Sequence, residues 1–183
     1  MRFTETRLKG AYLIEIEPIE DERGFFARNW CQKEFAAHRL NASFVQCNFS
    51  YNKKIGTLRG MHYQRGPHAE IKLVSCTAGA IYDVIIDLRQ ESSTFRQWIG
   101  EELTAQNHKM VYIPEGFAHG FQTLTDHCTL LYLHTGFYQS DREGRIRYND
   151  PVIGISWPIE VTCISEKDLY PPLLSERFKG LLI

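Results

Sequence analysis

The residues best suited to acid–base chemistry gather in two short segments of the chain. Residues 56–64, with the sequence GTLRGMHYQ, contain His62, and residues 113–121, with the sequence IPEGFAHGF, contain His119. Lys72 follows the first segment. A histidine exchanges protons near neutral pH, and a lysine can stabilise developing negative charge. If short strands aim these side chains into one cavity, they outline an active site.

On a strand, His62 would share its face with Gly60 and Gln64. A histidine that points into a barrel beside polar neighbours is suited to proton transfer near neutral pH. The alternative is a core histidine whose ring bonds a backbone carbonyl. The spacing alone leaves both interpretations open.

Lys72 would alternate with Glu70 and Val74 on a strand, so it would share a face with an apolar residue. Lysine is rarely buried without a partner, and an inward lysine indicates an anion or a developing negative charge nearby. The alternative is a lysine on an edge strand that faces water.

A metal site is a further hypothesis. His62, Gln64, Glu70 and His119 roughly follow the ligand spacing of metal-binding double-stranded β-helix proteins, and two histidines with a carboxylate suit divalent iron. Glutamine stands where a second histidine of a His-x-His pair is expected, which weakens this hypothesis.

Two further residues are ordinary when they are considered alone. Tyr132 lies in the strand-like run of residues 130–134, where a buried hydroxyl could be a general acid or could simply pack. Asp168 closes a Ser-x-x-Asp sequence, which is also typical of a helix N-terminal capping box.

Length and composition indicate how many domains and which kinds of binding partner to expect. The 183 residues are enough for a single domain, which we expect to span residues 1–183. The 21 basic residues nearly balance the 22 acidic ones, for a formal net charge of -1. This balance gives no electrostatic reason to expect binding to nucleic acid or to an anionic membrane surface.

The five cysteines are odd in number and widely separated, without a C-x-x-C pair, so we expect reduced thiols in a cytoplasmic protein. The N-terminus is charged, and no apolar run approaches the ~20 residues that span a bilayer. We therefore expect a soluble, intracellular protein.

Apolar, β-branched and aromatic clusters recur along the chain between turn residues, and they predict strands at 11–16, 71–76, 80–88, 109–113 and 129–134. Helical patterns are confined to residues 31–40 and 171–176. Many short strands with regular turns favour an all-β sandwich or barrel with small helical embellishments.

With these residues in view, the chain resembles the nucleotide-sugar 3,5-epimerases typified by dTDP-4-dehydrorhamnose 3,5-epimerase. The matching segments run in the family's order over almost the whole chain, at residues 21–26, 58–64, 72–74, 83–84, 87–89, 93–95, 113–121, 149–151, 157–158 and 165–168.

The resemblance implies a cupin-type jelly-roll β-barrel of two antiparallel sheets, a homodimer, and catalysis with neither a metal nor another cofactor. His62 falls at the family's general base, Tyr132 at its general acid, Asp168 at the carboxylate that orients the histidine, and Lys72 at the cation beside the substrate's keto oxygen. The substrate-contact positions that the resemblance implies are Arg23, Phe26, Arg28, Gln46, Asn48, Arg59, His119, Tyr138, Glu143 and Lys167.

These residue types suit the implied reaction. A C4 ketone acidifies the protons on C3 and C5, and removal of one gives an enolate whose charge a cation can stabilise. Inversion requires a base and an acid on opposite faces of the ring. We therefore expect an epimerase that acts at C3, C5 or both on a nucleotide-linked 4-keto-6-deoxyhexose, in deoxysugar synthesis. The alternatives are a metal-dependent cupin enzyme that uses His62 and His119, and a non-catalytic sugar-nucleotide binding protein.

Overall fold

The computed structural model describes residues 1–175 and 177–183. Its strands and helices, in chain order, are β1 (Arg2–Glu5), β2 (Tyr12–Glu15), β3 (Ile19–Asp21), β4 (Gly24–Phe26), α1 (Gln32–Ala37), β5 (Gln46–Asn52), β6 (Thr57–Gln64), β7 (Lys72–Ala78), β8 (Ala80–Asp87), β9 (Trp98–Thr104), β10 (Lys109–Ile113), β11 (Phe117–Thr123), β12 (Cys128–His134), β13 (Glu143–Arg145), β14 (Cys163–Ile164) and α2 (Glu166–Leu169).

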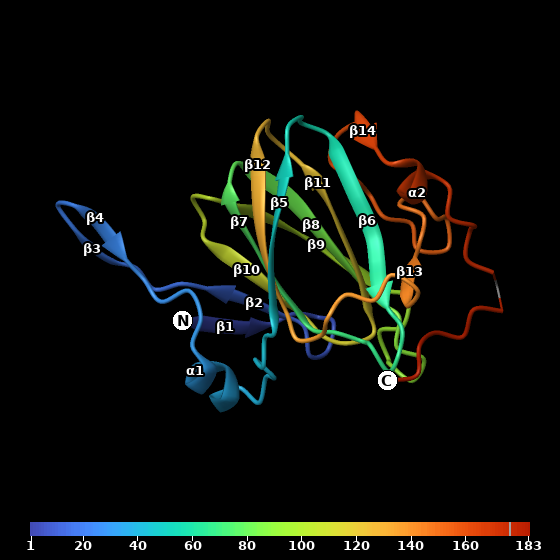
Figure 1. Cartoon of the computed structure of the whole chain (residues 1–183), viewed down its shortest axis with the longest axis horizontal. Coiled ribbons are helices and arrows are strands. Elements are labelled where there is room, and N and C mark those ends of the chain that lie inside the picture. The colour runs from blue at the N-terminus through green and yellow to red at the C-terminus, as the bar shows by residue number, and fades with distance from the viewer. Residues whose placement is uncertain (176) are drawn as a thin grey trace.

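Two large sheets form a barrel (Figure 1). One has the strand order β1-β2-β10-β7-β12-β5, and the other has the order β13-β6-β11-β8-β9. Neighbouring strands within these orders are antiparallel, while the short β14 adds to β6 in parallel. The predicted all-β jelly-roll barrel of two antiparallel sheets is confirmed.

Alternation along the strands builds the core. On β10, Val111 and Ile113 face the space between the sheets, while Met110 and Tyr112 face outward and pack with Phe35 of α1. Successive side chains of a strand point to opposite faces, so one strand serves two apolar clusters. The helix predicted at residues 31–40 is confirmed over Gln32–Ala37, and its buried residue is Phe35.

The segment that follows β13 covers the outer face of the second sheet, where Trp157 and Leu174 pack against Met61 and Ile86. Because this segment lies over the sheet, every residue of β11 is buried, and the strand is covered on both faces. The buried position of β11 also shields the residues that it contributes to the barrel interior.

The predicted helix at residues 171–176 is wrong for the part that the structure describes, since residues 171–175 are irregular. Pro171 and Pro172 lack the backbone N–H that a continuing helix needs. Glu176 lies outside the described residues. The helix present in this region, α2, is a single turn that ends just before these prolines.

The β3–β4 hairpin projects away from the barrel (Figure 1). All of its strand residues are exposed, and the Phe26 side chain is 77% exposed. The Phe25 ring meets the His108 ring edge-on, with centroids 4.9 Å apart. Over residues 1–175 and 177–183, no helix is long and apolar enough to cross a membrane.

Candidate active site

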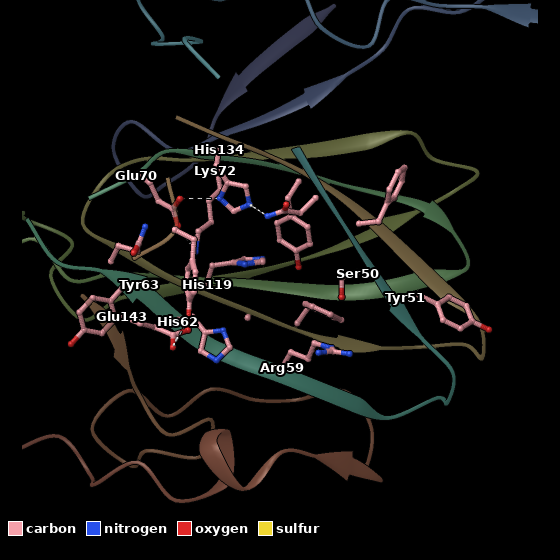
Figure 2. A pocket seen from close by; sticks show the side chains of 17 residues that line it. Ser50, Tyr51, Arg59, His62, Tyr63, Glu70, Lys72, His119, His134 and Glu143 are labelled. Carbon is pink, nitrogen blue, oxygen red and sulfur yellow. Dashed lines mark hydrogen bonds and ion pairs between the residues drawn. The ribbon is translucent and has the colours of Figure 1, made fainter. Parts of the chain in front are cut away.

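A cavity of about 430 Å³ lies between the two sheets (Figure 2). Strands of both sheets contribute side chains to its wall. Eight of the predicted site residues line it, namely Asn48, Arg59, His62, Lys72, His119, Tyr132, Tyr138 and Glu143.

The His62 ring forms a hydrogen bond with Asp168, which does not itself line the cavity. Its Nε2 lies 2.6 Å from Asp168 Oδ1, and the carboxylate is 5% exposed. A neutral imidazole bonded in this way donates its Nε2 proton to the carboxylate, which leaves the Nδ1 lone pair as the acceptor. In the part of the chain that the structure describes, Nδ1 has no hydrogen-bond partner. The pair therefore has the construction of an oriented general base.

Helix α2 fixes the position of Asp168. The Ser165 hydroxyl caps the helix by accepting a hydrogen bond from the Asp168 backbone N–H at 3.3 Å. Burial by itself would raise the pKa of Asp168, but hydrogen bonds from His62, from the Gly60 N–H and from Ser165 outweigh it and hold the pKa below its usual value. Asp168 is thus ionised beside His62, while the capping role in the predicted Ser-x-x-Asp sequence belongs to Ser165.

An irregularity between β6 and β11 brings Arg59 and His62 to the same cavity. His119 pairs with His62, whereas Phe121 pairs with Arg59, so the register shifts by one residue between them. Residues three apart on a regular strand point to opposite faces, and a bulge removes that conflict. The backbones of β6 and β11 approach closely at this point, since Gly60 has no Cβ. A Cβ added at Gly60 would lie 2.5 Å from the Gly120 Cα.

Lys72 points into the cavity from β7. This strand lies between β10 and β12, so the alternative of an edge-strand lysine is excluded. The Lys72 Nζ lies 3.4 Å from Glu70 Oε1, and the lysine side chain is only 12% exposed. An ammonium group is therefore held inside the barrel by a carboxylate.

Tyr132 enters the cavity from β12, on the sheet that faces His62. Burial raises the pKa of its phenol well above the usual value, the nearby charge of Asp83 raises it further, and Arg59 opposes both effects. At neutral pH the hydroxyl thus keeps its proton, as a general acid requires.

His119 is anchored in the same manner as His62. Its Nε2 lies 2.7 Å from Asp83 Oδ2, and both side chains are buried. The ring meets Tyr132 edge-on, with centroids 5.8 Å apart. The second oxygen of Asp83 is buried without a hydrogen-bond partner among the described residues.

Tyr138 and Glu143 lie at the rim of the cavity. The Tyr138 hydroxyl lies 3.5 Å from Glu143 Oε2, and its backbone N–H donates to Gln46 Oε1 at 3.3 Å. The Tyr138 side chain is 55% exposed. Gln46 does not line the cavity itself, but it bonds the backbone of Tyr138 at the rim.

Besides Gln46, four predicted substrate-contact residues lie outside the cavity of their own chain. Arg23 and Phe26 belong to the projecting β3–β4 hairpin, where Arg23 pairs with Asp21. Arg28 follows the hairpin and pairs with Glu34 of α1 at 2.7 Å. Lys167 is exposed on α2, next to the buried Asp168.

Sequence reasoning missed three groups as members of an acid–base site. Glu70 was considered only as a metal ligand, and His134 and Asp83 were not considered. The signal was present in the alternation: His134 lies two residues after Tyr132, and Asp83 shares a strand face with Ile81 and Ile85 of the inner core.

The metal hypothesis gains no support from the arrangement of side chains. His62 and His119 lie opposite each other, but each directs Nε2 to its own aspartate. Over the described residues, no group of three His, Cys, Asp or Glu side chains is arranged to hold a metal ion. Gln64 instead accepts a hydrogen bond from the Gln139 backbone N–H at 2.9 Å.

Comparison with known proteins yields one consistent family. A sequence profile described as dTDP-4-dehydrorhamnose 3,5-epimerase matches residues 5–176. The Salmonella typhimurium dTDP-4-dehydrorhamnose 3,5-epimerase is 43% identical over 174 residues, which cover 94% of each protein.

Two solved structures agree with this match. The Bacillus anthracis dTDP-4-dehydrorhamnose 3,5-epimerase with TDP and PPi bound has a TM-score of 0.92 and 42% identity, covering 94% of this chain and 99% of that one. The Legionella pneumophila dTDP-6-deoxy-D-glucose-3,5-epimerase in complex with dTDP-4-keto-L-rhamnose has a TM-score of 0.86 and 38% identity, covering 91% of this chain and 89% of that one.

Proposed function

This chain belongs to the dTDP-4-dehydrorhamnose 3,5-epimerase family, and on that premise we propose that it epimerises a nucleotide-linked 4-keto-6-deoxyhexose at C3, C5 or both. It is then an isomerase of deoxysugar biosynthesis, with a substrate of the dTDP-4-dehydro-6-deoxyglucose type. The observation that carries the proposal is that Asp168 orients His62, which faces Lys72 and Tyr132 of the opposite sheet across one cavity.

In the proposed reaction, His62 accepts the proton from the carbon next to the ketone. The imidazolium that forms is stabilised by the ionised Asp168, whose negative charge lies 2.6 Å from Nε2. The electron pair of the broken C–H bond moves into the ring, giving an enolate whose charge lies on the C4 oxygen.

Lys72 is the proposed partner of that oxygen. Its ammonium group is already inside the barrel, so little reorganisation is required when negative charge develops. Tyr132 then gives its phenolic proton to the carbon from the opposite face, which inverts the configuration. A proton leaves and a proton returns without electron transfer, so the proposed chemistry needs no redox cofactor and no metal.

The remaining cavity residues suit the nucleotide part of the substrate. The guanidinium of Arg59 can bond the diphosphate through paired N–H groups, while its Nε donates to Asn52 Oδ1 at 2.7 Å. Tyr138 presents an exposed ring at the rim, where a nucleobase can stack. Asn48, His119 and Glu143 complete this proposed set of contacts.

We further propose that the protein acts as a homodimer in which each β3–β4 hairpin reaches the cavity of the other copy. Arg23, Phe26 and Arg28 are proposed substrate contacts, yet they lie outside the cavity of their own chain. An isolated two-stranded hairpin is marginally stable, and its exposed Ile19 and Phe26 favour burial against a partner. A second copy would both cover these side chains and receive the three contacts.

The test is incubation of the protein with dTDP-4-keto-6-deoxyglucose in deuterated water, followed by NMR of the sugar. Deuterium at C3, C5 or both, together with inversion at the same carbon, is the expected result. If neither carbon takes up deuterium above the rate without enzyme, the proposed function is wrong.

A further inference from the structure

A third carboxylate–imidazole pair lies in the cavity, on the sheet opposite His62. Glu70 Oε2 lies 3.0 Å from His134 Nδ1, while Glu70 Oε1 lies 3.4 Å from Lys72 Nζ. Lys72 and His134 are paired residues on neighbouring strands, so the carboxylate connects two groups that lie side by side (Figure 2).

These three side chains are nearly removed from water, with exposed fractions of 6% for Glu70, 12% for Lys72 and 11% for His134. Burial by itself would raise the pKa of Glu70, but the hydrogen bond to His134 and the charge of Lys72 outweigh it and leave the pKa below its usual value. Glu70 is thus charged, and both of its oxygens are engaged.

The backbone holds Glu70 in place relative to β12. The Ile71 N–H donates to the Thr135 hydroxyl at 2.9 Å, and the Thr135 N–H donates to the Ile71 carbonyl at 3.1 Å. These bonds join the residue after Glu70 to the residue after His134. The backbone that carries the Glu70 side chain is therefore held in a fixed position relative to β12.

His134 in turn contacts the proposed general acid. Its ring is nearly parallel to the Tyr132 ring, with an interplanar angle of 15° and centroids 5.8 Å apart. The other ring nitrogen, Nε2, lies 3.4 Å from Asn48 Nδ2. The imidazole thus lies between Glu70 and Tyr132, and it limits where the phenol can move.

We propose that Glu70 is a positioning residue. It fixes the position of the Lys72 ammonium group directly and the position of the Tyr132 phenol through the imidazole of His134. A lysine has a flexible four-carbon stem, and stabilisation of a transition state depends on placing its charge before the reaction. The Glu70 carboxylate therefore aligns two groups. Lys72 is aligned with the enolate oxygen, and Tyr132 is aligned to donate the proton that completes inversion. This inference rests on the proposed function of the same cavity.

The kinetic test uses Glu70→Gln, which keeps the side-chain volume but has a single acceptor oxygen and so cannot serve both partners. We expect kcat to fall by ~10-fold or more, with KM changed less than ~3-fold, because the lost alignment acts mainly in the transition state. Glu102→Gln, at an exposed position of β9, is the matched control and should keep wild-type kinetics.

A double-mutant cycle separates positioning from a general structural effect. In a Lys72→Met, Tyr132→Phe background, Glu70→Gln should cost less than ~2-fold in residual deuterium exchange, because the groups that it positions are gone. An equal cost in both backgrounds, or a wild-type kcat for Glu70→Gln alone, would overturn the proposal.

A readout independent of activity is the NMR signal of the His134 Nδ1 proton, assigned by its loss in His134→Phe. We expect a downfield signal in the wild type that shifts or disappears in Glu70→Gln, and an unchanged signal contradicts the proposal. If the wild type exchanges no deuterium, the proposed function fails, and this signal decides the positioning by itself. If Glu70→Gln does not fold, His134→Phe replaces it, and a wild-type kcat for that variant overturns the link to Tyr132.

Discussion

His62 Nε2 lies 2.6 Å from Asp168 Oδ1, although 106 positions separate the two residues in the chain. The contact joins strand β6 of a large sheet to the one-turn helix α2 near the C-terminus. Because the carboxylate is nearly buried, its charge is screened weakly by water and acts strongly on the imidazole.

Replacement of Asp168 should change how stability depends on pH. The folded-state pKa of this group is lowered, so its contribution is fully present above the ordinary carboxyl value of about 3.9 and is lost as the pH falls through the lower folded value. Urea unfolding between pH 7 and pH 2 should show a steeper acid loss of unfolding free energy for the wild type than for Asp168→Asn.

The exposed Asp141 provides the control for this measurement. Asp141→Asn should give a curve parallel to the wild type, because solvent screens an exposed carboxylate. Parallel curves for the wild type and Asp168→Asn would contradict the stabilising role of the ionised carboxylate.

Gly60→Ala should destabilise the protein by at least ~2 kcal/mol, since it combines an unfavourable backbone conformation with overpacking. Gly60 has φ +121, and its new Cβ would lie 2.5 Å from the Gly120 Cα. Thermal and urea unfolding measure the loss. Gly66→Ala is the control, because its Cβ would have no neighbour closer than 3.9 Å. Equal losses of unfolding free energy in the two variants would contradict the stabilising role of the close approach between β6 and β11.

The hairpin proposal predicts complementation between two inactive variants. One copy carries His62→Ala, and the other carries Arg23→Ala with Phe26→Ala. If hairpins are exchanged, a mixed dimer contains one cavity with both His62 and an intact hairpin, and random pairing should restore about a quarter of the wild-type activity. Co-expression followed by an activity assay measures this recovery. No recovery in mixed dimers, or a monomer in analytical ultracentrifugation, would refute the exchange.

The strands that carry the cavity could be predicted from alternation and turn residues. Strands β8, β10 and β12 lie within or nearly within the predicted runs at 80–88, 109–113 and 129–134. Strand β9 was not predicted, because Gly100 and two adjacent glutamates interrupt its apolar pattern. Local sequence gives no such signal for the β3–β4 hairpin, whose residues are all exposed.

Less of the candidate active site than of the fold could be predicted from the residues alone. Alternation placed His62 on one strand face with Gly60 and Gln64, which puts Arg59 on the opposite face, and only the register shift between β6 and β11 brings Arg59 and His62 together. The partnership of His62 with Asp168 came from the family resemblance, since the local sequence around Asp168 predicts a helix cap. Glu70 and His134 meet through strand pairing, which a single sequence does not reveal.

The most direct test of the central claim compares His62→Ala with Tyr132→Phe in deuterated water, with exchange and inversion measured separately by NMR. His62→Ala should lose exchange at both carbons by ~10²–10⁴-fold, because no enolate forms without the base. Tyr132→Phe should retain some exchange with little inversion, because an enolate that lacks its acid is reprotonated from the original face. Near-normal exchange in His62→Ala would contradict the assignment of the base, and with it the account of this cavity.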